Sequence, residues 1–228
     1  MPVVIAARQM GVKSALYLPD IQPGLAIQAL ARLVNVVCVS FEASRRYLPA
    51  QKVVETGYPT RPELFAARDK AAARSALGLA TDTPTVLIFG GSRGAQRINE
   101  AAIETMRQLQ GRVALQLILQ TGRADYERVK GIVEAEKLPA HVLPFVKKIH
   151  MAYAAADLVV CRAGAMTLAE IAVCGLPAIL VPYPYAAHNH QEDNAANLVD
   201  RGAAVMILDA ELTGDRLARE VAHLLADK

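Results

Sequence analysis

A glycine-rich turn between a predicted strand and a predicted helix is the first place in this sequence where chemistry is expected. In TVLIFGGSRGAQRIN, the apolar run Thr85–Phe89 leads into GGSRG, which includes Gly91, Ser92 and Gly94. Glycines let the backbone approach a phosphate, and the free N–H groups at a helix start favour an anion. The Ser92 hydroxyl would add a donor. The turn is neither G-x-G-x-x-G nor G-K-[ST], so a dehydrogenase or a P-loop nucleotidase is not indicated, and tight packing explains the glycines equally well.

A second turn places a carboxylate near a helix start. The predicted strand Asp157–Cys161 is followed by RAG and by a helix that carries Glu170. A carboxylate there accepts both hydrogen bonds of a vicinal diol, as the acidic residue of ribose-binding sites does. The alternative is a capping box, TLAE from Thr167 to Glu170, in which the carboxylate satisfies backbone N–H groups. This segment alone favours the capping interpretation, and Cys161 and Cys174 are interpreted as buried small apolar residues.

Polar residues cluster in a third turn, after the predicted strand Ala178–Val181. His188 and His190 are two residues apart, unlike the i, i+4 pair with which one helix face binds a metal. The sequence also has no D-x-D pair to hold Mg²⁺, so neither a metal nor a cofactor is expected. Gln191 and Asn194 fall on one helix face, where their amides would bind sugar hydroxyls or a phosphate. For this turn alone, a solvated helix start is the favoured interpretation.

The elements that must position these turns alternate strictly between strand and helix. Short β-branched apolar runs predict strands over Val12–Leu18, Val34–Ser40, Pro84–Phe89, Val113–Gln120, His141–Phe145, Asp157–Cys161, Ala178–Val181 and Ala203–Leu208. Helical periodicity predicts helices over Leu25–Leu33, Ala66–Leu77, Ala95–Gln110, Ala124–Glu136, Met151–Ala156, Thr167–Cys174, His190–Arg201 and Thr213–Ala226. This alternation requires right-handed crossovers and a parallel sheet covered on both faces. The expected fold class is therefore α/β, with doubly wound parallel sheets.

Composition excludes several other classes of protein. The 228 residues are 53% hydrophobic and 21% charged, which suits a globular chain with a sizeable core. The net charge of +3 is too small for a protein that binds nucleic acid by charge alone. A glycine and three prolines interrupt the apolar stretch from Val173 to Ala187, so it cannot form the ~20-residue helix that spans a bilayer. Three separated cysteines and an opening without a basic leader predict a reducing, cytoplasmic setting.

One irregular passage, TGYPTRPELF from Thr56 to Phe65, divides the chain. Pro59 and Pro62 disfavour helix at the residues before them, so the passage is interpreted as an interdomain connection. The predicted organisation is the C-terminal part of a first domain over residues 1–56, with two convincing strands, then a linker over 57–65. A nearly complete doubly wound domain follows over 66–228.

Three segments together resemble the MurG family, the N-acetylglucosaminyltransferases of peptidoglycan synthesis. They are GGSRGAQRIN, CRAGAMTLAEIAVCGLPAILVPYPYAAHNHQEDNAAN and TGYPTRPELF, and the likeness covers nearly the whole chain in the right order. MurG-like enzymes have two Rossmann-like domains, of the GT-B type, facing across a cleft. The resemblance implies inverting, metal-independent transfer of N-acetylglucosamine from UDP-N-acetylglucosamine to undecaprenyl-pyrophosphoryl-N-acetylmuramoyl-pentapeptide, at the cytoplasmic face of the cell membrane.

The resemblance also assigns roles to individual residues of the donor domain. It places at the UDP-sugar Arg61, Gly91, Ser92, Gly94, Val146, Ala165, Met166, Thr167, Glu170, His190, Gln191 and Asn194. The glycine loop with Ser92 and the helix start at Ala165 to Thr167 would hold the diphosphate, and Arg61 would lie by the nucleotide. Val146 would present backbone groups to the uracil, and Glu170 would accept from the ribose hydroxyls. Gln191, with His190 and Asn194, would contact the donor sugar.

The sequence matches fewer of the family's acceptor-side residues than of its donor-side residues. Asp20 falls near the position of a family asparagine, which leaves that acceptor-side or donor-side contact open. The family's candidate base belongs to a G-G-T-G-G-H loop that does not occur here, so no catalytic base is assigned. We therefore expect the first domain to be truncated and the chain alone not to be fully competent. A non-catalytic UDP-sugar-binding fragment, or a related enzyme with another lipid acceptor such as diacylglycerol, are the alternatives.

The expected partners are the UDP-sugar, the lipid-linked acceptor and the cytoplasmic membrane surface, with no nucleic acid. Arg45 and Arg46 with Tyr47 and Leu48 form a basic and apolar cluster that would suit a membrane surface. An ordinary solvated helix end is the favoured interpretation of that cluster.

Overall fold

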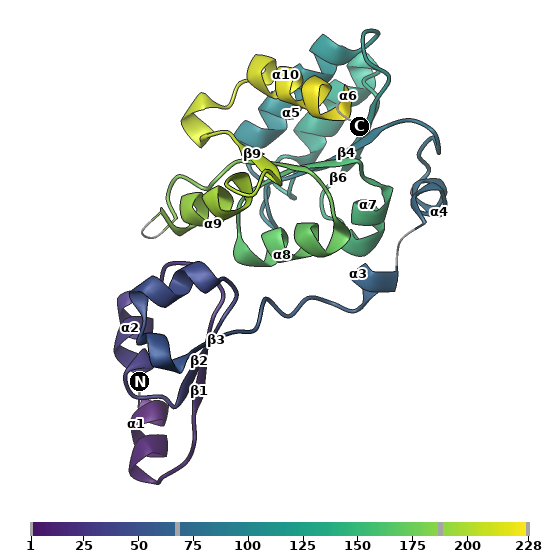
Figure 1. The fold of residues 1–228 in the computed structure, drawn as a ribbon. Coiled ribbons are helices and arrows are strands. Elements are labelled where there is room, and N and C mark those ends of the chain that lie inside the picture. The colour runs from purple at the N-terminus through teal and green to yellow at the C-terminus, as the bar shows by residue number, and fades with distance from the viewer. Residues whose placement is uncertain (1, 67–68, 187–188, 227–228) are drawn as a thin grey trace.

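The first part of the chain folds around a small parallel sheet of order β1-β2-β3 (Figure 1). The structure is a computed structural model and describes residues 2–66, 69–186 and 189–226. The elements of this part are α1 (Pro2–Gln9), β1 (Ala15–Leu18), α2 (Leu25–Ala31), β2 (Val36–Val39), the 3₁₀ helices η1 (Glu42–Tyr47) and η2 (Ala50–Lys52), and β3 (Val53–Glu55). No regular secondary structure occurs over residues 56–61, which lead to the larger part of the molecule.

The larger part is built on a second parallel sheet of order β6-β5-β4-β7-β8-β9. Its strands are β4 (Thr85–Phe89), β5 (Gln116–Gln120), β6 (Ala140–Leu143), β7 (Leu158–Cys161), β8 (Ala178–Leu180) and β9 (Ala204–Met206). Its helices are α3 (Glu63–Ala66), α4 (Lys70–Ala76), α5 (Gln96–Leu109), α6 (Tyr126–Glu136), α7 (Ile149–Ala155), α8 (Ala165–Cys174), α9 (His190–Val199), η4 (Asp209–Glu211) and α10 (Gly214–Ala226). The strand order reverses between β4 and β7. An open parallel sheet leaves a crevice for ligands at such a reversal.

Helices cover both faces of the larger sheet, as Figure 1 shows. Val86 and Ile88 of β4 pack into a core with α5, α6 and α10, whereas Leu87 and Phe89 pack into a second core with α7 and α8. All four side chains are buried. A strand buried on both faces reads as a continuous apolar run, which is why β4 shows no polar alternation. The predicted doubly wound α/β architecture is confirmed.

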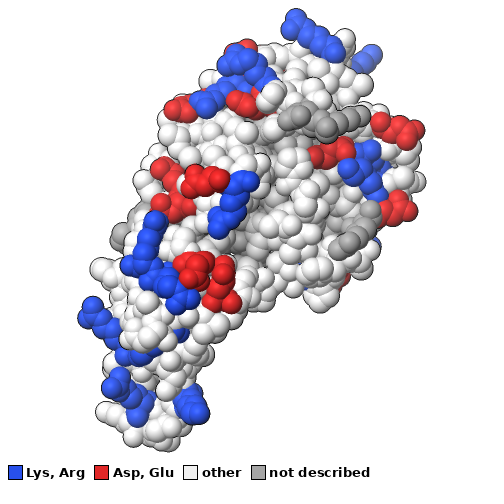
Figure 2. All heavy atoms as spheres, viewed as in Figure 1, with Lys and Arg blue, Asp and Glu red and all other residues white. Residues whose placement is uncertain are grey.

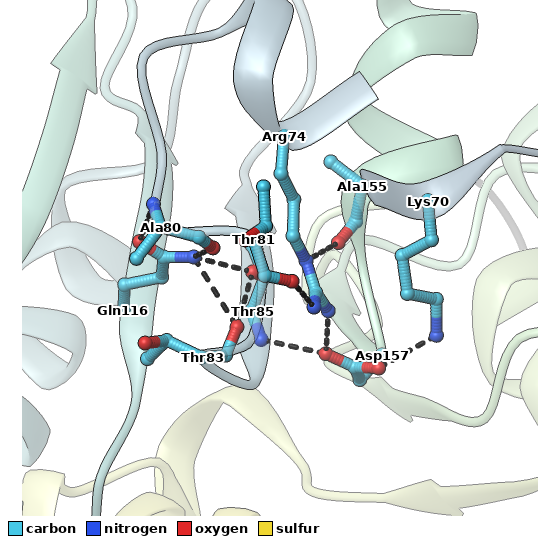
Figure 3. A network of polar contacts seen from close by, with 9 residues as sticks. All are labelled: Lys70, Arg74, Ala80, Thr81, Thr83, Thr85, Gln116, Ala155 and Asp157. Carbon is cyan, nitrogen blue, oxygen red and sulfur yellow. Dashed lines mark hydrogen bonds and ion pairs between the residues drawn. The ribbon is translucent and has the colours of Figure 1, made fainter. Parts of the chain in front are cut away.

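A polar network fastens α4 to the amino ends of β4 and β7 (Figure 3). The buried Arg74 donates to the carbonyls of Ala155, at 3.0 Å, and Thr81, at 2.7 Å, and pairs with Asp157. Asp157 also accepts from the N–H of Thr85 at 2.7 Å. The network lies at the edge of the sheet opposite to the crevice, so it is a structural anchor and not part of a ligand site.

The expected strands are present, with bounds that differ by at most three residues. A further strand, β3, was missed and raises the number before the linker from two to three among the described residues. Three residues are too few to display an alternating pattern. Helix α1 was also missed, because its apolar residues are consecutive in the sequence instead of helically spaced, and none of them is fully buried.

The helix expected over Ala66–Leu77 begins later, at Lys70. Asp69 caps it, because its carboxylate accepts from the N–H of Ala72 at 2.9 Å. A short separate helix, α3, precedes the cap and extends into the stretch predicted as linker. Within the described part of the chain, no helix is both long enough and apolar enough to cross a membrane.

Candidate functional site

A cavity of about 590 Å³ lies at the carboxyl ends of β4 and β7, where the strand order reverses. The residues that line it are Phe89, Gly90, Gly91, Ser92, Arg93, Gly94, Ala95, Gln96, Arg162, Gly164, Thr167, Tyr183 and Gln191. They come from the end of β4, from the loops after β4, β7 and β8, and from the first turns of α5, α8 and α9. Five residues predicted from the sequence therefore share one cavity: Gly91, Ser92, Gly94, Thr167 and Gln191.

The glycines of the first loop serve two different purposes. A Cβ atom on Gly94 would lie 1.9 Å from the carbonyl oxygen of Thr121, and one on Gly90 would lie 2.4 Å from Ala95. These two glycines permit close packing. Gly91 has φ +90°, and a Cβ atom built on it would have no neighbour within 4 Å among the described residues. The space beside its backbone is therefore open. The packing interpretation thus holds for Gly90 and Gly94, whereas Gly91 leaves room for a ligand to approach the backbone.

Two helices begin at this cavity without a side-chain cap. The N-cap residues are Ala95 for α5 and Gly164 for α8, and neither provides a capping hydrogen bond. Ser92, before α5, is exposed. In the first turn of α8, Ala165 is buried and Met166 is 48% exposed. Unpaired N–H groups and the positive ends of two helix dipoles therefore face one cavity, an arrangement that favours an anion such as a diphosphate.

Glu170 is not a capping residue, which corrects the interpretation favoured by its local sequence. Helix α8 begins at Ala165, so Thr167 lies inside the helix and cannot act as its N-cap. Glu170 is 4% exposed, and its Oε1 lies 3.1 Å from Nε of Arg61. Tyr153 donates its hydroxyl to Oε2 at 3.1 Å. The Glu170 carboxylate is buried, and one of its oxygens pairs with an arginine of the linker. Such a carboxylate can also accept hydrogen bonds from a ligand.

The environment of Tyr153 keeps its hydroxyl protonated. Burial is the main reason that its pKa lies well above the usual range, and Cys161 and Glu170 raise it further. Cys161 is fully buried as expected, and burial raises the pKa of its thiol. Cys174 is only partly buried, which differs from the expectation.

The segment after β8 brings an amide to the cavity. Oε1 of Gln191 accepts from the N–H of Ala163 at 3.1 Å and from the N–H of Tyr183 at 3.0 Å. The oxygen is thus used by the protein, and the amide nitrogen, which can only donate, is the group of Gln191 suited to a ligand that offers an acceptor. His190 begins α9 and is partly buried. His188, the other histidine of this turn, lies outside the described residues.

Asn194 connects the two sheets of the molecule. It is fully buried, and its Nδ2 donates to Oδ1 of Asp20 at 2.9 Å and to the carbonyl of Ala163 at 3.3 Å. Its Oδ1 accepts from the N–H of Ile21 at 3.2 Å. Gln22 donates to Asp193 beside it. The residue predicted on the donor sugar thus contacts the residue predicted near the acceptor, and both belong to a contact between the β1 turn and α9.

The sequence pattern of the glycosyltransferase family 28 C-terminal domain matches residues 85–228, which include the whole larger sheet. The chain belongs to this family. The glycine loop, the uncapped start of α8 and Glu170 all lie within the matched region of the family 28 domain.

Two bacterial transferases are similar to this chain over nearly its whole length, beyond the region that the family pattern matches. The chain is 40% identical over 234 residues to the UDP-N-acetylglucosamine--N-acetylmuramyl-(pentapeptide) pyrophosphoryl-undecaprenol N-acetylglucosamine transferase of Desulforamulus reducens, covering 100% of this chain and 63% of that protein. It is 41% identical to the same transferase of Geobacter sp. strain M21, covering 98% of this chain and 59% of that protein. The resemblance to the MurG family is confirmed, and the chain spans about three fifths of the length of these relatives.

A solved structure of a family 28 relative agrees with the fold. The crystal structure of Acinetobacter baumannii MurG superposes with a TM-score of 0.80 at 31% identity, over 98% of this chain and 61% of that chain. The match includes both sheets, since 98% of the chain is covered. The two-sheet GT-B architecture expected from the sequence is therefore confirmed.

Two residues of this family 28 site were not singled out from the sequence. Gln120 ends β5 and contacts both Gly91 and Val146, so the Val146 N–H is already engaged by a side chain. Val146 itself is buried and does not line the cavity. Arg162 lines the cavity and forms an ion pair with Asp209 at 2.6 Å. Position in the sequence was the available signal: Gln120 directly follows the apolar run Leu117–Leu119, and Arg162 directly follows the apolar strand β7.

Proposed function

We propose that the chain carries the UDP-N-acetylglucosamine site of an enzyme that transfers N-acetylglucosamine to undecaprenyl-pyrophosphoryl-N-acetylmuramoyl-pentapeptide. One observation carries the proposal. Two uncapped helix starts, the open backbone at Gly91 and the amide of Gln191 converge on one cavity at the strand reversal. The identity to transferases of that name over the full length of the chain supports the substrate class.

In the proposed complex the diphosphate accepts hydrogen bonds at the two helix starts. The α5 side contributes the Gly91–Ser92 backbone and the Ser92 hydroxyl, and the α8 side contributes the N–H groups near Ala165 to Thr167. These donors are aligned before the ligand arrives, so they stabilise the negative charge that develops on departing UDP at little reorganisation cost. The proposal assigns no catalytic base.

The nucleoside binds beyond the diphosphate, toward Glu170. The carboxylate accepts from the two ribose hydroxyls, and in doing so it competes with Arg61, which is 44% exposed and 3.1 Å away. Released from that contact, the Arg61 guanidinium remains close to the nucleotide. Gln191 donates its amide N–H to the transferred sugar, and His190 lies beside it at the start of α9.

The acceptor side of the proposal involves the first part of the chain. Residues 1–56 contain six Lys or Arg and three Asp or Glu, and Figure 2 shows basic side chains spread over this lower part of the molecule. Such a surface suits the anionic headgroups of the cytoplasmic membrane face, where the lipid acceptor resides. Arg45 contributes less than its sequence suggests, because Glu42 pairs with it at 2.5 Å. Asp20 stays a proposed acceptor-side residue.

Calorimetric titration of the purified chain with UDP-N-acetylglucosamine tests the donor site. We expect binding that free UDP competes for and that ADP does not, and absence of UDP binding would refute the proposal. Transfer to a soluble lipid-acceptor analogue tests the reaction, with a diacylglycerol acceptor as the comparison. Binding without turnover favours the non-catalytic alternative, and turnover with diacylglycerol alone favours the other acceptor class.

Liposome co-sedimentation tests the membrane surface separately. We expect more binding to vesicles with anionic lipid than to neutral ones, and a decrease as salt is raised, because surface charges are screened. Sedimentation that does not depend on lipid charge would contradict the membrane proposal and leave the donor site unaffected.

A further inference from the structure

Gln120 joins the two loops on either side of its strand. It is the last residue of β5, and its side chain is 4% exposed. Its Nε2 donates to the carbonyl of Gly91 at 2.9 Å, and its Oε1 accepts from the N–H of Val146 at 2.8 Å. One buried carboxamide therefore fixes the distance between the glycine loop after β4 and the segment after β6.

Each of these hydrogen bonds also fixes the direction of a peptide group. In a planar trans peptide the C=O and N–H groups point to opposite sides, and no cis peptide occurs among the described residues. The Gly91 carbonyl points toward Gln120, so the N–H of Ser92, in the same peptide, points away from it. The Val146 N–H points toward Gln120, so the carbonyl of Phe145 points away.

We propose that Gln120 is a positioning residue that couples recognition of the base to recognition of the diphosphate. It turns the Ser92 N–H outward as a donor for the diphosphate, and it turns the Phe145 carbonyl outward as an acceptor for the imide N3–H of uracil. This inference rests on the proposed function and deepens it. A carbonyl acceptor suits uracil, whereas N3 of cytosine carries no hydrogen at neutral pH.

Only a carboxamide satisfies both backbone partners at this position. Glutamate would still accept from Val146 but could not donate to Gly91, and it would place a negative charge beneath the diphosphate. Leucine would leave the buried N–H of Val146 without this partner, whereas the Gly91 carbonyl would keep only the N–H of Gly94, at 3.0 Å, so both peptide groups would be held less firmly in their present orientation. The effect of a substitution on ligand binding therefore depends on which of the two bonds it removes.

The same strand offers a matched control at its other end. Gln116 begins β5, donates to the carbonyls of Ala80 at 2.7 Å and Thr83 at 3.2 Å, and accepts from the Ala80 N–H at 3.0 Å (Figure 3). Its carboxamide thus braces backbone in the same manner, at the edge of the sheet away from the cavity. Substitutions there affect stability without touching the proposed nucleotide site.

The experiment measures the affinities of UDP and uridine, and the melting temperature, for Gln120→Leu, Gln120→Glu, Gln116→Leu and Gln116→Glu. We expect Gln120→Leu to weaken UDP binding about tenfold, because the less firmly held loops should cost the complex about the free energy of one net hydrogen bond. Gln120→Glu should weaken UDP binding at least as much and uridine binding much less, because only UDP carries the diphosphate. Both Gln116 variants should keep wild-type affinities even where their melting temperature falls.

The possible outcomes are separable. If the wild-type chain does not bind UDP, the proposed function fails and this inference fails with it. If the wild type binds UDP and both Gln120 variants bind it equally well, or if the Gln116 variants lose as much affinity, the inference alone is overturned. A UDP analogue methylated at uracil N3 tests the Phe145 carbonyl on the wild-type chain: we expect at least roughly tenfold weaker binding, and equal binding would overturn the assigned orientation even if the Gln120 variants do not fold.

Discussion

Replacing Glu170 by glutamine isolates the proposed ribose contact. The substitution keeps the shape of the side chain and one acceptor oxygen, and it removes the charge. Glu170 is 4% exposed and contacts Arg61 and Tyr153, each at 3.1 Å. The Tyr153 hydroxyl can still donate to the amide oxygen. The change therefore acts mainly on the Arg61 pair and on any ligand that shares the carboxylate.

The expected loss of affinity follows from the number of charged hydrogen bonds. A carboxylate accepts from both ribose hydroxyls, whereas the amide can accept from one of them through its single oxygen. A hydrogen bond to a charged acceptor contributes about 1.5–3 kcal/mol. Losing one of the two thus predicts a Kd for UDP that is about 10- to 150-fold weaker.

The expected effect on stability is much smaller. Arg61 is 44% exposed and retains access to solvent when its partner becomes neutral, so the pair contributes about 0–1 kcal/mol. Removing a buried charge also relieves its desolvation. The melting temperature should therefore change by less than about 4 °C.

The assay is a cycle of two proteins and two ligands, measured by calorimetry together with thermal denaturation. Wild type and Glu170→Gln are each titrated with UDP and with a UDP analogue that lacks both ribose hydroxyls. The analogue should bind both proteins alike, because the group that Glu170 would contact is gone. Glu134→Gln on α6, where the side chain is 67% exposed, is the control for a neutralised helix glutamate.

Two results would refute the ribose assignment. One is unchanged UDP affinity together with a large fall in melting temperature, which would make Glu170 a structural residue that holds Arg61 and Tyr153. The other is an equal loss of affinity for UDP and for the analogue without ribose hydroxyls. That outcome would mean that the substitution disturbs the site as a whole.

Three further predictions concern other parts of the structure. Ser92→Ala should weaken UDP binding but hardly affect uridine binding in the same titrations, and an equal loss for both ligands would contradict the diphosphate role. Arg74→Met should lower the free energy of unfolding by about 3 kcal/mol, because it takes the Arg74 donor from the carbonyls of Ala155 and Thr81 and leaves Lys70 as the cation on Asp157; denaturant unfolding measures this, and UDP affinity should not change. Arg128 is the main cause that lowers the pKa of Asp125, so its stabilisation is present above about pH 4 and is lost as pH falls through the lowered pKa. In denaturation experiments, Asp125→Asn should therefore lose less stability than wild type on acidification, and a parallel loss in both proteins would contradict the assignment.

Much of the larger sheet follows from local sequence. Strands such as Thr85–Phe89 are buried on both faces and so appear as unbroken apolar runs, and the helices between them have an apolar period. Elements without these signals were missed: β3 has three residues, and α1 buries none of its side chains. Element ends were set by single side chains, such as the Asp69 cap of α4.

The roles of individual site residues were harder to obtain from sequence. The same four letters, TLAE, suit a capping box or a ligand carboxylate, and the choice depends on whether the N-cap of α8 is Gly164 or Thr167. Gly91 and Gly94 are alike in the sequence, but only Gly94 has the Thr121 backbone against it. The neighbours that distinguish these cases belong to other strands and loops.

By itself, the sequence determined that this is a doubly wound α/β chain of the MurG type, and that chemistry lies in three turns after its strands. Burial period and turn composition are local properties, so a single chain displays them. Only the tertiary structure decided that Asn194 meets Asp20 across 174 positions of sequence, and that Gln120 holds Gly91 and Val146 together. Strand order brings these residues into contact, and strand order depends on how all the helices pack against both faces of the sheet.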